Sequence, residues 1–342
     1  MNKKDGILTI AFLSIVHAAV DFTCIFSLFH SYQSVAEAFL IYNFCAFALQ
    51  MPFGILLDLF NSKSDHPEVV SSYFTIAGIL FTALGAYVSP IVSGIGNALF
   101  HTGGGVISMK QDEKFGFKGR GLGVFVAPGA FGVLFGTLFA GSVFYQQILI
   151  AVTCILFIMA LYLKMNNGIM SFENAEKKRI STDSSKILLA SLAAVILRSV
   201  CGMAVSFEWK QGVFYAVVSV ACIACGKAAG GFLSAAIGKK KAVWISLCAA
   251  AACFALGKNP VCGLAALFFF NMTMPLTLSE AVHAVPDLPG FAFGILTFGL
   301  FIGYLPVAYG IYAKVPEWHG TFMSIATLMI LLYAAHLSGK RS

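Results

Sequence analysis

The sequence has very little charge. Only 11% of its 342 residues are Asp, Glu, Lys or Arg, whereas hydrophobic residues make up 59%. A soluble domain carries about 25% charged residues, so the apolar side chains of this chain would have no way to avoid water. The shortage of charge therefore excludes an ordinary soluble protein. It indicates an integral membrane protein whose partner is lipid, and the runs of apolar residues leave no room for a soluble domain.

Several motifs are also missing. No Walker-type phosphate-binding sequence occurs, so we expect no ATP-driven step in this chain. The nine cysteines lie in or at the ends of apolar segments, and Cys222-x-x-Cys225 has no second pair, so neither a disulfide framework nor a metal or other cofactor is expected. The net charge of +7 does not indicate a nucleic-acid partner, because the basic residues stand at the edges of apolar segments.

Long apolar runs are abundant. A helix needs about 20 apolar residues to cross the bilayer, and continuous rather than alternating runs favour helices over a barrel. The first run follows Lys3 and Lys4 but lacks a small-x-small cleavage site, so we interpret it as a retained span. The sequence predicts an all-α integral membrane protein with 12 transmembrane helices, at about 6–29, 35–59, 69–88, 91–109, 121–141, 144–164, 187–207, 212–237, 240–257, 260–279, 290–313 and 319–336.

The positive charges fall on alternate connections between these spans. Seventeen of the 22 Lys and Arg residues lie on one side and three, Lys210, Lys258 and Lys314, on the other. Short loops rich in Lys and Arg stay in the cytoplasm. We therefore predict a multi-pass protein of the cell (plasma) membrane, or inner membrane, with both termini cytoplasmic. Two basic residues remain inside spans, Arg198 and Lys227.

The chain divides into two halves. Its longest polar stretch predicts a cytoplasmic linker at 166–186, between an N-terminal six-helix bundle at 1–165 and a C-terminal six-helix bundle at 187–342. Gly54 and Gly231 take similar places in the second span of each half, and the fifth and eleventh spans are both rich in glycine and contain Pro128 and Pro306. Such internal repeats predict a substrate site at the repeat interface, near mid-membrane.

Several motifs carry a resemblance to the major facilitator superfamily. Gly54-x-x-x-Asp58 resembles the start of the superfamily's G-x-x-x-D-R-x-G-R-R motif, and residues 123–132 resemble the fifth-span motif of its antiporters. Within the superfamily, the chain most resembles fosmidomycin-resistance-type efflux proteins, through His17-x-x-x-Asp21 and Gly94-x-Gly96-x-x-x-Phe100-His101.

The resemblance implies two pseudo-symmetric six-helix bundles and a secondary active transporter, not an enzyme. It implies alternating access and proton-coupled efflux (antiport) of a small molecule by a monomer. Arg198 favours an anionic or zwitterionic substrate, because an arginine in a membrane needs an acid, carbonyl dipoles or an anion as partner. Alternatives are proton symport for uptake of a small organic anion, and a membrane enzyme or sensor in which His17, Asp21 and His101 form a metal site.

Proton coupling is assigned to three residues. His17 and Asp21 share one helix face and together could pass a proton. The alternative is a static hydrogen bond that holds the first span in place. Glu37, close to the outer end of the second span, is the third candidate.

Substrate contact is assigned to Arg198 and to polar residues inside spans, each with a structural alternative. Arg198 instead could form a structural pair with Asp21 or another acid. His101 could be a satisfied core histidine in a glycine stretch that packs helices. The remaining candidates, which could instead hold helices together, are Asn43, Gln50, Asn97 and Asn271.

Conformational roles are assigned to Asp58, Gly54, Pro128 and Lys227. Asp58 is expected to interact with the N-terminus of a neighbouring helix, and the resemblance implies that this contact stabilises one transport conformation. Lys227 lines a cavity or extends its ammonium to the inner surface.

Overall fold

The computed structural model describes residues 2–31, 35–166, 181–311 and 313–339. Most of the predicted linker lies outside these ranges. So do five of the basic residues used to orient the chain, Lys177, Lys178, Arg179, Lys340 and Arg341.

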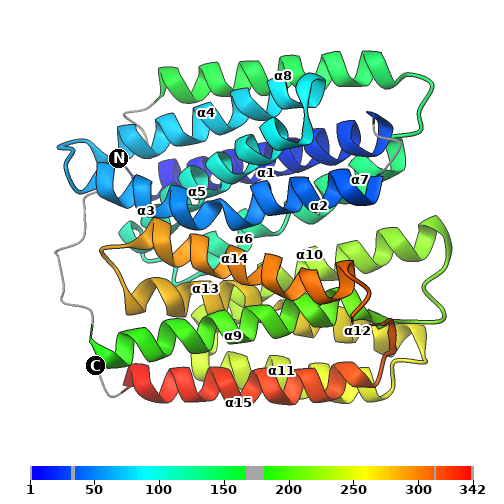
Figure 1. Ribbon diagram of the computed structural model, residues 1–342. Helices are drawn as coiled ribbons and strands as arrows, with labels where there is room; N and C mark the ends of the chain where they lie inside the picture. The colour runs from blue at the N-terminus through cyan, green and yellow to red at the C-terminus, as the bar shows by residue number, and fades with distance from the viewer. Residues whose placement is uncertain (1, 32–34, 167–180, 312, 340–342) are drawn as a thin grey trace. The chain divides into compact units, whose positions relative to one another are not determined.

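The described residues form fifteen α-helices, one π-helical turn and two short strands (Figure 1). Their bounds are α1 Lys3–Ser31, α2 Val35–Asn43, η1 Phe44–Ala48, α3 Gln50–Asn61, α4 Pro67–Val88, α5 Pro90–Lys114, α6 Arg120–Val126, α7 Gly129–Phe139, α8 Tyr145–Met165, α9 Thr182–Ala204, β1 Val205–Ser206, α10 Gly212–Ile237, α11 Lys239–Ala255, α12 Pro260–Asn271, α13 Thr273–Ala284, α14 Pro289–Ala308, β2 Val315–Pro316 and α15 His319–Gly339.

Each of the twelve predicted spans coincides with one of these helices or with two or three consecutive helical segments, so the all-α membrane fold is confirmed. Within the described residues, ten helical segments are long and apolar enough to cross a membrane. The other two predicted spans correspond to α5, which contains several glycines and polar residues, and to α11, which is 17 residues long.

Three predicted spans are interrupted where the sequence suggested continuous helices. The second contains the π-helical turn, the fifth breaks at Ala127–Pro128, and the tenth breaks at Met272. Proline explains two of the breaks. Pro128 and Pro275 have no backbone N–H to bond the carbonyl four residues earlier, and proline fits best in the first turn of the helix that follows.

The chain contacts define two compact units. Unit 1 comprises Met1–Gly116, Val124–Glu176 and Asp287–Ile295, and unit 2 comprises Phe117–Gly123, Lys177–Pro286 and Leu296–Ser342. The units do not follow the chain strictly. The first turns of α14 belong to unit 1, and residues 117–123 belong to unit 2.

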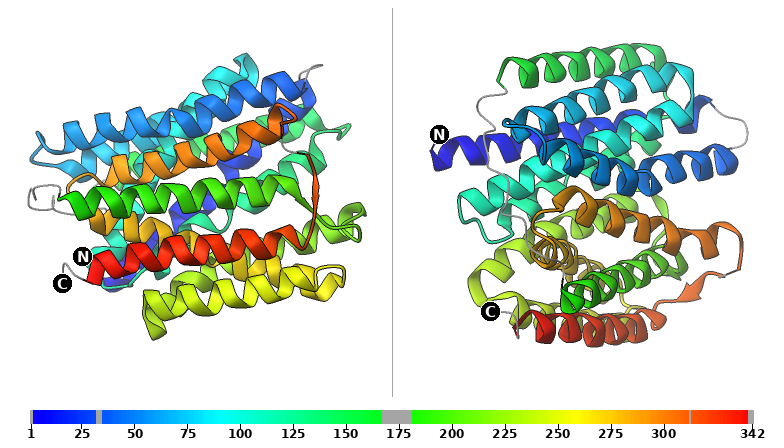
Figure 2. Two further views of the ribbon diagram at one scale, coloured as in Figure 1. Left: turned by 60° about the horizontal axis from the view of Figure 1, so that its bottom comes forward. Right: turned by 60° about the vertical axis from the view of Figure 1, so that its left-hand side comes forward.

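Unit 1 is held together by closely packed helices. α4 lies beside α5, and α1 lies beside α7 (Figures 1 and 2). A Cβ atom on Gly132 of α7 would come within 2.3 Å of the Ala18 carbonyl oxygen of α1. Because only glycine permits this approach, α7 lies against the face of α1 that carries the polar residues described below.

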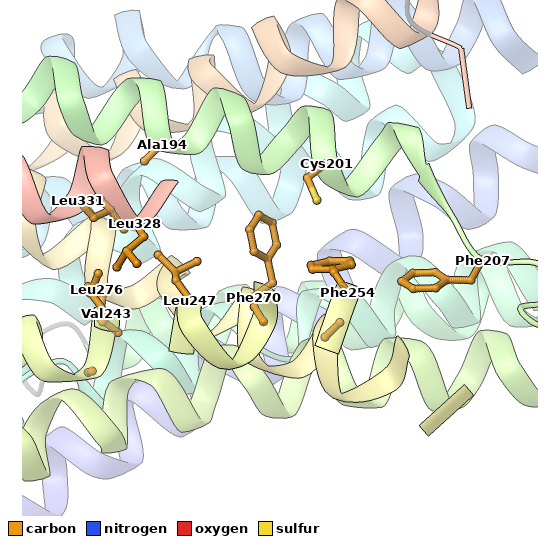
Figure 3. Packing of buried hydrophobic residues seen from close by; sticks show 13 residues of the cluster. Ala194, Cys201, Phe207, Val243, Leu247, Phe254, Phe270, Leu276, Leu328 and Leu331 are labelled. Carbon is orange, nitrogen blue, oxygen red and sulfur yellow. The ribbon is translucent and has the colours of Figure 1, made fainter. Parts of the chain in front are cut away.

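Unit 2 has an apolar core built from α9, α11, α12, α13 and α15. In Figure 3, Phe207, Phe254 and Phe270 lie in succession within this core. Phe254 stacks on Phe207 and meets Phe270 edge to face, with ring centres 6.1 and 5.7 Å apart. Aromatic pairs in this geometry contribute about 0.5–1.5 kcal/mol beyond the burial of their area. In the same unit, the parallel strands β1 and β2 pair the segment after α9 with the segment between α14 and α15.

Candidate functional site

Four of the predicted site residues meet inside unit 1. His17 and Asp21 extend from α1, and Asn97 and His101 extend from α5; we call these four the His–Asp cluster. The Nε2 atoms of the two histidines are 2.9 Å apart, and His17 Nε2 lies 3.2 Å from Asp21 Oδ2. His101 Nε2 lies 3.8 Å from Asp21 Oδ1.

Sequence spacing explains how the two helices supply these groups. Each helix carries two polar residues four positions apart, so each pair lies on one face, about one turn apart. α1 and α5 pack against each other, and the two faces meet. His17, His101 and Asn97 are only 6%, 8% and 2% exposed, and the cluster is therefore nearly closed to solvent.

The break at Pro128 supplies two backbone acceptors to α1. Pro128 cannot donate to the Val124 carbonyl, and the Ser14 hydroxyl shares its one hydrogen between that oxygen, at 3.2 Å, and the Ile10 carbonyl of its own helix, at 2.7 Å. In an unbroken helix the Phe125 carbonyl would accept from the N–H of residue 129. Here His17 Nδ1 donates to it at 2.8 Å. The interrupted helix thus orients the His17 ring.

The second ring and the carboxylate are oriented from α5. His101 Nδ1 donates to the carbonyl of Asn97 at 2.9 Å, and Asn97 Nδ2 donates to Asp21 Oδ1 at 2.8 Å. A carbonyl only accepts, so the Nδ1 atom of each histidine carries a hydrogen. Each Nε2 atom is thereby directed toward the other ring and Asp21.

Gly129 leaves the space beside these atoms open. A Cβ atom there would lie 2.2 Å from His17 Nε2 and 2.5 Å from Asp21 Oδ2. Real Cβ atoms do not approach polar atoms so closely, so any side chain at position 129 would displace the His17–Asp21 pair. The first residue of α7 is therefore part of the construction of the cluster.

The same atoms are the group within the described residues that could hold a metal ion, because one ligand atom from each of His17, Asp21 and His101 lies within 4.8 Å of the others. Two nitrogens bound at about 2.0–2.1 Å to a tetrahedral zinc ion would lie about 3.3 Å apart. The observed Nε2–Nε2 distance of 2.9 Å is that of a hydrogen bond. The folded cluster fits a shared proton better than zinc.

Electrostatics explain why these groups are found together. A buried carboxylate is costly unless it is paired and hydrogen-bonded. Asp21, whose side chain is 13% exposed, has two imidazoles and one amide within reach. An imidazole changes its charge near neutral pH. The cluster therefore places two groups that can carry a proton beside the carboxylate whose charge that proton would balance.

Three other predicted substrate contacts lie outside this cluster. Asn43, Gln50 and Asn271 each donate their side-chain amide to the carbonyl four residues earlier in their own helical segment, at 2.7, 2.6 and 2.8 Å. These amide donors are therefore used locally. Gln50 is fully buried, and its Oε1 atom has no hydrogen-bond partner among the described residues.

The remaining charged candidates are separate. Arg198 is partly exposed on α9, and within the described part of unit 2 it makes no hydrogen bond or ion pair. Lys227 is partly exposed in the middle of α10. Glu37 is exposed in the first turn of α2 and is not part of the His–Asp cluster.

Asp58 makes the expected contact with a helix N-terminus. Its Oδ1 and Oδ2 atoms accept hydrogen bonds from the backbone N–H groups of Gly290 and Phe291, at 2.9 and 2.7 Å, in the first turn of α14. Gly54 lies one turn earlier on α3, and a Cβ there would meet the Gly290 carbonyl oxygen at 2.1 Å. The carboxylate can reach both donors because two glycines let α3 and α14 approach.

Sequence reasoning missed the supporting residues. Ser14, Phe125 and Gly129 shape the cluster but carried no predicted role. The missing N–H of Pro128 was a usable signal, because it implies an unpaired carbonyl at position 124 that some neighbour must satisfy. No local signal identified α1 as that neighbour.

Known structures share the fold. The chain superposes on the E. coli fucose:proton symporter FucP, with a TM-score of 0.65 and 13% identity, over 97% of this chain and 98% of that one. It superposes equally well on the human organic anion transporter MFSD10 (TETRAN), with a TM-score of 0.65 and 13% identity over 98% and 100% of the two chains. A bacterial homologue of the iron transporter ferroportin gives 0.61 and 13% over 99% of both chains.

The sequence itself matches no family model and no curated protein sequence. The structural neighbours are major facilitator superfamily transporters, so the chain has the fold of that superfamily.

Proposed function

We propose that this protein is a secondary active transporter, not an enzyme, that moves a small anionic or zwitterionic molecule by alternating access. Its proposed mode is proton-coupled efflux, with protons moving inward as substrate leaves. The His–Asp cluster is the observation that carries this proposal. Three titratable groups lie within hydrogen-bonding reach inside a membrane-spanning bundle, where ionisable groups are costly and mark ion or substrate pathways.

The fold supports transport, and two neighbours support the choice of solutes. FucP is described as a proton symporter and MFSD10 as an organic anion transporter. The resemblance to fosmidomycin-resistance-type efflux proteins, carried by His17, Asp21 and His101, supports export.

Arg198 supports an anionic substrate. It stays charged at any pH the protein meets, and the described part of unit 2 offers it no acidic partner. A substrate carboxylate or phosphate would supply the missing charge through paired hydrogen bonds. Asn43, Gln50 and Asn271 are also proposed to contact substrate, and Lys227 is proposed to have a conformational role.

The test is transport in proteoliposomes, after a thermal-shift screen of small anions has found a ligand. Arg198→Ala is expected to reduce uptake of that anion at least about tenfold, because a charge-assisted hydrogen bond contributes about 1.5–3 kcal/mol. Lys210→Ala, which removes a basic residue from a loop of the same unit, is the matched control and should transport normally. Undiminished transport by Arg198→Ala would refute the anion-binding role.

A second candidate is proton symport for uptake of a small organic anion. The shared fold with FucP, described as a fucose:proton symporter, favours it. An imposed pH gradient separates the two modes. Antiport predicts substrate flux opposite to the proton gradient, whereas symport predicts accumulation in the same direction as the protons.

We further propose that the protein acts as a monomer in the cell membrane, with both termini in the cytoplasm. The distribution of Lys and Arg over the connections supports this orientation.

A further inference from the structure

The contact between the two histidines requires a hydrogen that neutral rings do not have. A neutral imidazole carries one N–H, and in both His17 and His101 that hydrogen is used at Nδ1, on the carbonyls of Phe125 and Asn97. Both Nε2 atoms would then present lone pairs to each other at 2.9 Å. Two acceptors at this distance repel, so a contact of this length requires one additional proton.

The charge balance of the cluster agrees. One imidazolium contributes a positive charge, and Asp21, 3.2 Å from His17 Nε2 and 3.8 Å from His101 Nε2, contributes the negative charge that balances it. The amide of Asn97 holds the carboxylate in place at 2.8 Å. With the proton the cluster is neutral, and without it the bundle contains an unbalanced carboxylate and two opposed lone pairs.

We propose that, in the conformation described, the His–Asp cluster holds one proton between Nε2 of His17 and Nε2 of His101, and that loss of this proton separates the two rings. This inference rests on the proposed function and deepens it, because it names the protonation state of this conformation. The part of the structure that responds to loss of the proton is the contact between α1 and α5. The Phe125 carbonyl, just before the break at Pro128, also takes part through its hydrogen bond with His17.

The surroundings of the cluster limit what else can titrate. Among the described residues, the charge of Asp21 also acts on two further titratable groups, the thiol of Cys24 on α1 and the hydroxyl of Tyr42 on α2. Thiols and phenols are neutral between about pH 5 and pH 8, where imidazole titrates. From α6 and α7, Phe125 and Gly129 face the cluster and do not titrate.

The test compares hydrogen–deuterium exchange of residues 3–31, 90–114 and 120–139 at about pH 5 and pH 8, the range over which imidazole titrates, corrected for intrinsic rates. The parent protein in lipid nanodiscs should exchange several-fold faster at the higher pH. His101→Gln should remove this difference, because the glutamine amide donates to His17 Nε2 without an added proton. His30→Gln is the matched control on α1; His30 donates to the Ala140 carbonyl at 2.8 Å, away from the cluster, and this variant should behave as the parent.

Exchange that is independent of pH in the parent, or that keeps its pH dependence in His101→Gln, overturns the proposal. Protection that appears only with added zinc, and is lost with chelator, also overturns it by assigning the site to a metal. Nitrogen-15 NMR of histidine-labelled protein gives a second reading. One shared Nε2 hydrogen supports the proposal, and two bare Nε2 atoms overturn it.

These measurements need no substrate. A protein that shows the proton but transports nothing in proteoliposomes would refute the proposed function alone. A transporter without the proton would refute this inference alone.

Discussion

Asp21 and Asp58 are both carboxylates inside unit 1, but their partners differ in kind. Asp21 faces two imidazoles, which gain and lose protons. Asp58 faces two backbone N–H groups, which do not. A carboxylate paired with peptide donors at a helix N-terminus is held by the fixed positive end of that helix. At the residue scale, the first carboxylate is therefore suited to coupling and the second to holding a conformation.

Replacing Asp58 should alter turnover and leave affinity unchanged. Asp58→Asn leaves one oxygen to accept a hydrogen bond where two are needed. Hydrogen bonds to charged groups contribute about 1.5–3 kcal/mol, so a conformational equilibrium would shift about tenfold or more. The concentration dependence of transport in proteoliposomes measures this as a changed maximal rate at constant KM. Asp183→Asn, an exposed carboxylate in the first turn of α9, is the control; a raised KM in Asp58→Asn would contradict the conformational role.

At the element scale, the important feature is that the fifth span is two helices, not one. The break gives α1 two free carbonyls and places the first residue of α7, Gly129, against His17 and Asp21. A continuous helix would satisfy its own carbonyls and would offer nothing to orient His17.

Gly129→Ala should disrupt the cluster without unfolding the protein. The added methyl group would lie 2.2 Å from His17 Nε2, so the ring must move and the His17–His101 contact must lengthen. We expect loss of proton-coupled transport and of the pH-dependent exchange described above. Gly202→Ala is the matched control, because it is also helical and a Cβ there meets nothing within 4 Å. Normal coupling in Gly129→Ala would show that the space beside His17 is not needed.

The local part of this site was predictable, and the tertiary part was not. The four-residue spacing of His17 and Asp21 placed them on one face of a helix. His101 and Asn97 were predicted as site residues because polar groups inside a membrane span are costly. The sequence assigned them to substrate contact instead of contact with His17 and Asp21, because it does not show that α1 and α5 pack together. That packing depends on contacts between residues more than 70 positions apart, which no spacing rule encodes.

At the scale of the whole molecule, the span positions follow from physics that the sequence does express. Bilayer thickness fixes the length of an apolar run, so each predicted span coincides with helical segments. The division of the chain at the linker stays a prediction. Residues 287–295 belong to unit 1, in which Gly54 and Gly290 allow α3 and α14 to touch, and no signal in the sequence named α14 as the partner of α3.

The orientation in the membrane is a prediction at this scale. Lys258→Cys should react with a membrane-impermeant maleimide added outside intact cells, whereas Lys240→Cys should react only after permeabilisation. Both lysines are exposed, in the loop after α11 and in the first turn of α11 respectively. The parent protein measures background labelling of its own cysteines. The reverse pattern would invert the assigned topology.

The hydrogen bonds of Asp58 also constrain how the protein is made. Gly290 follows Asp58 by 232 residues, so ribosomes release the first six spans long before the donors for this carboxylate exist. Asp58 is only 4% exposed in the finished protein. During synthesis, unit 1 must therefore wait in an unfinished state in the bilayer until the eleventh span is inserted. Its assembly is completed only after the first turn of α14 has left the ribosome.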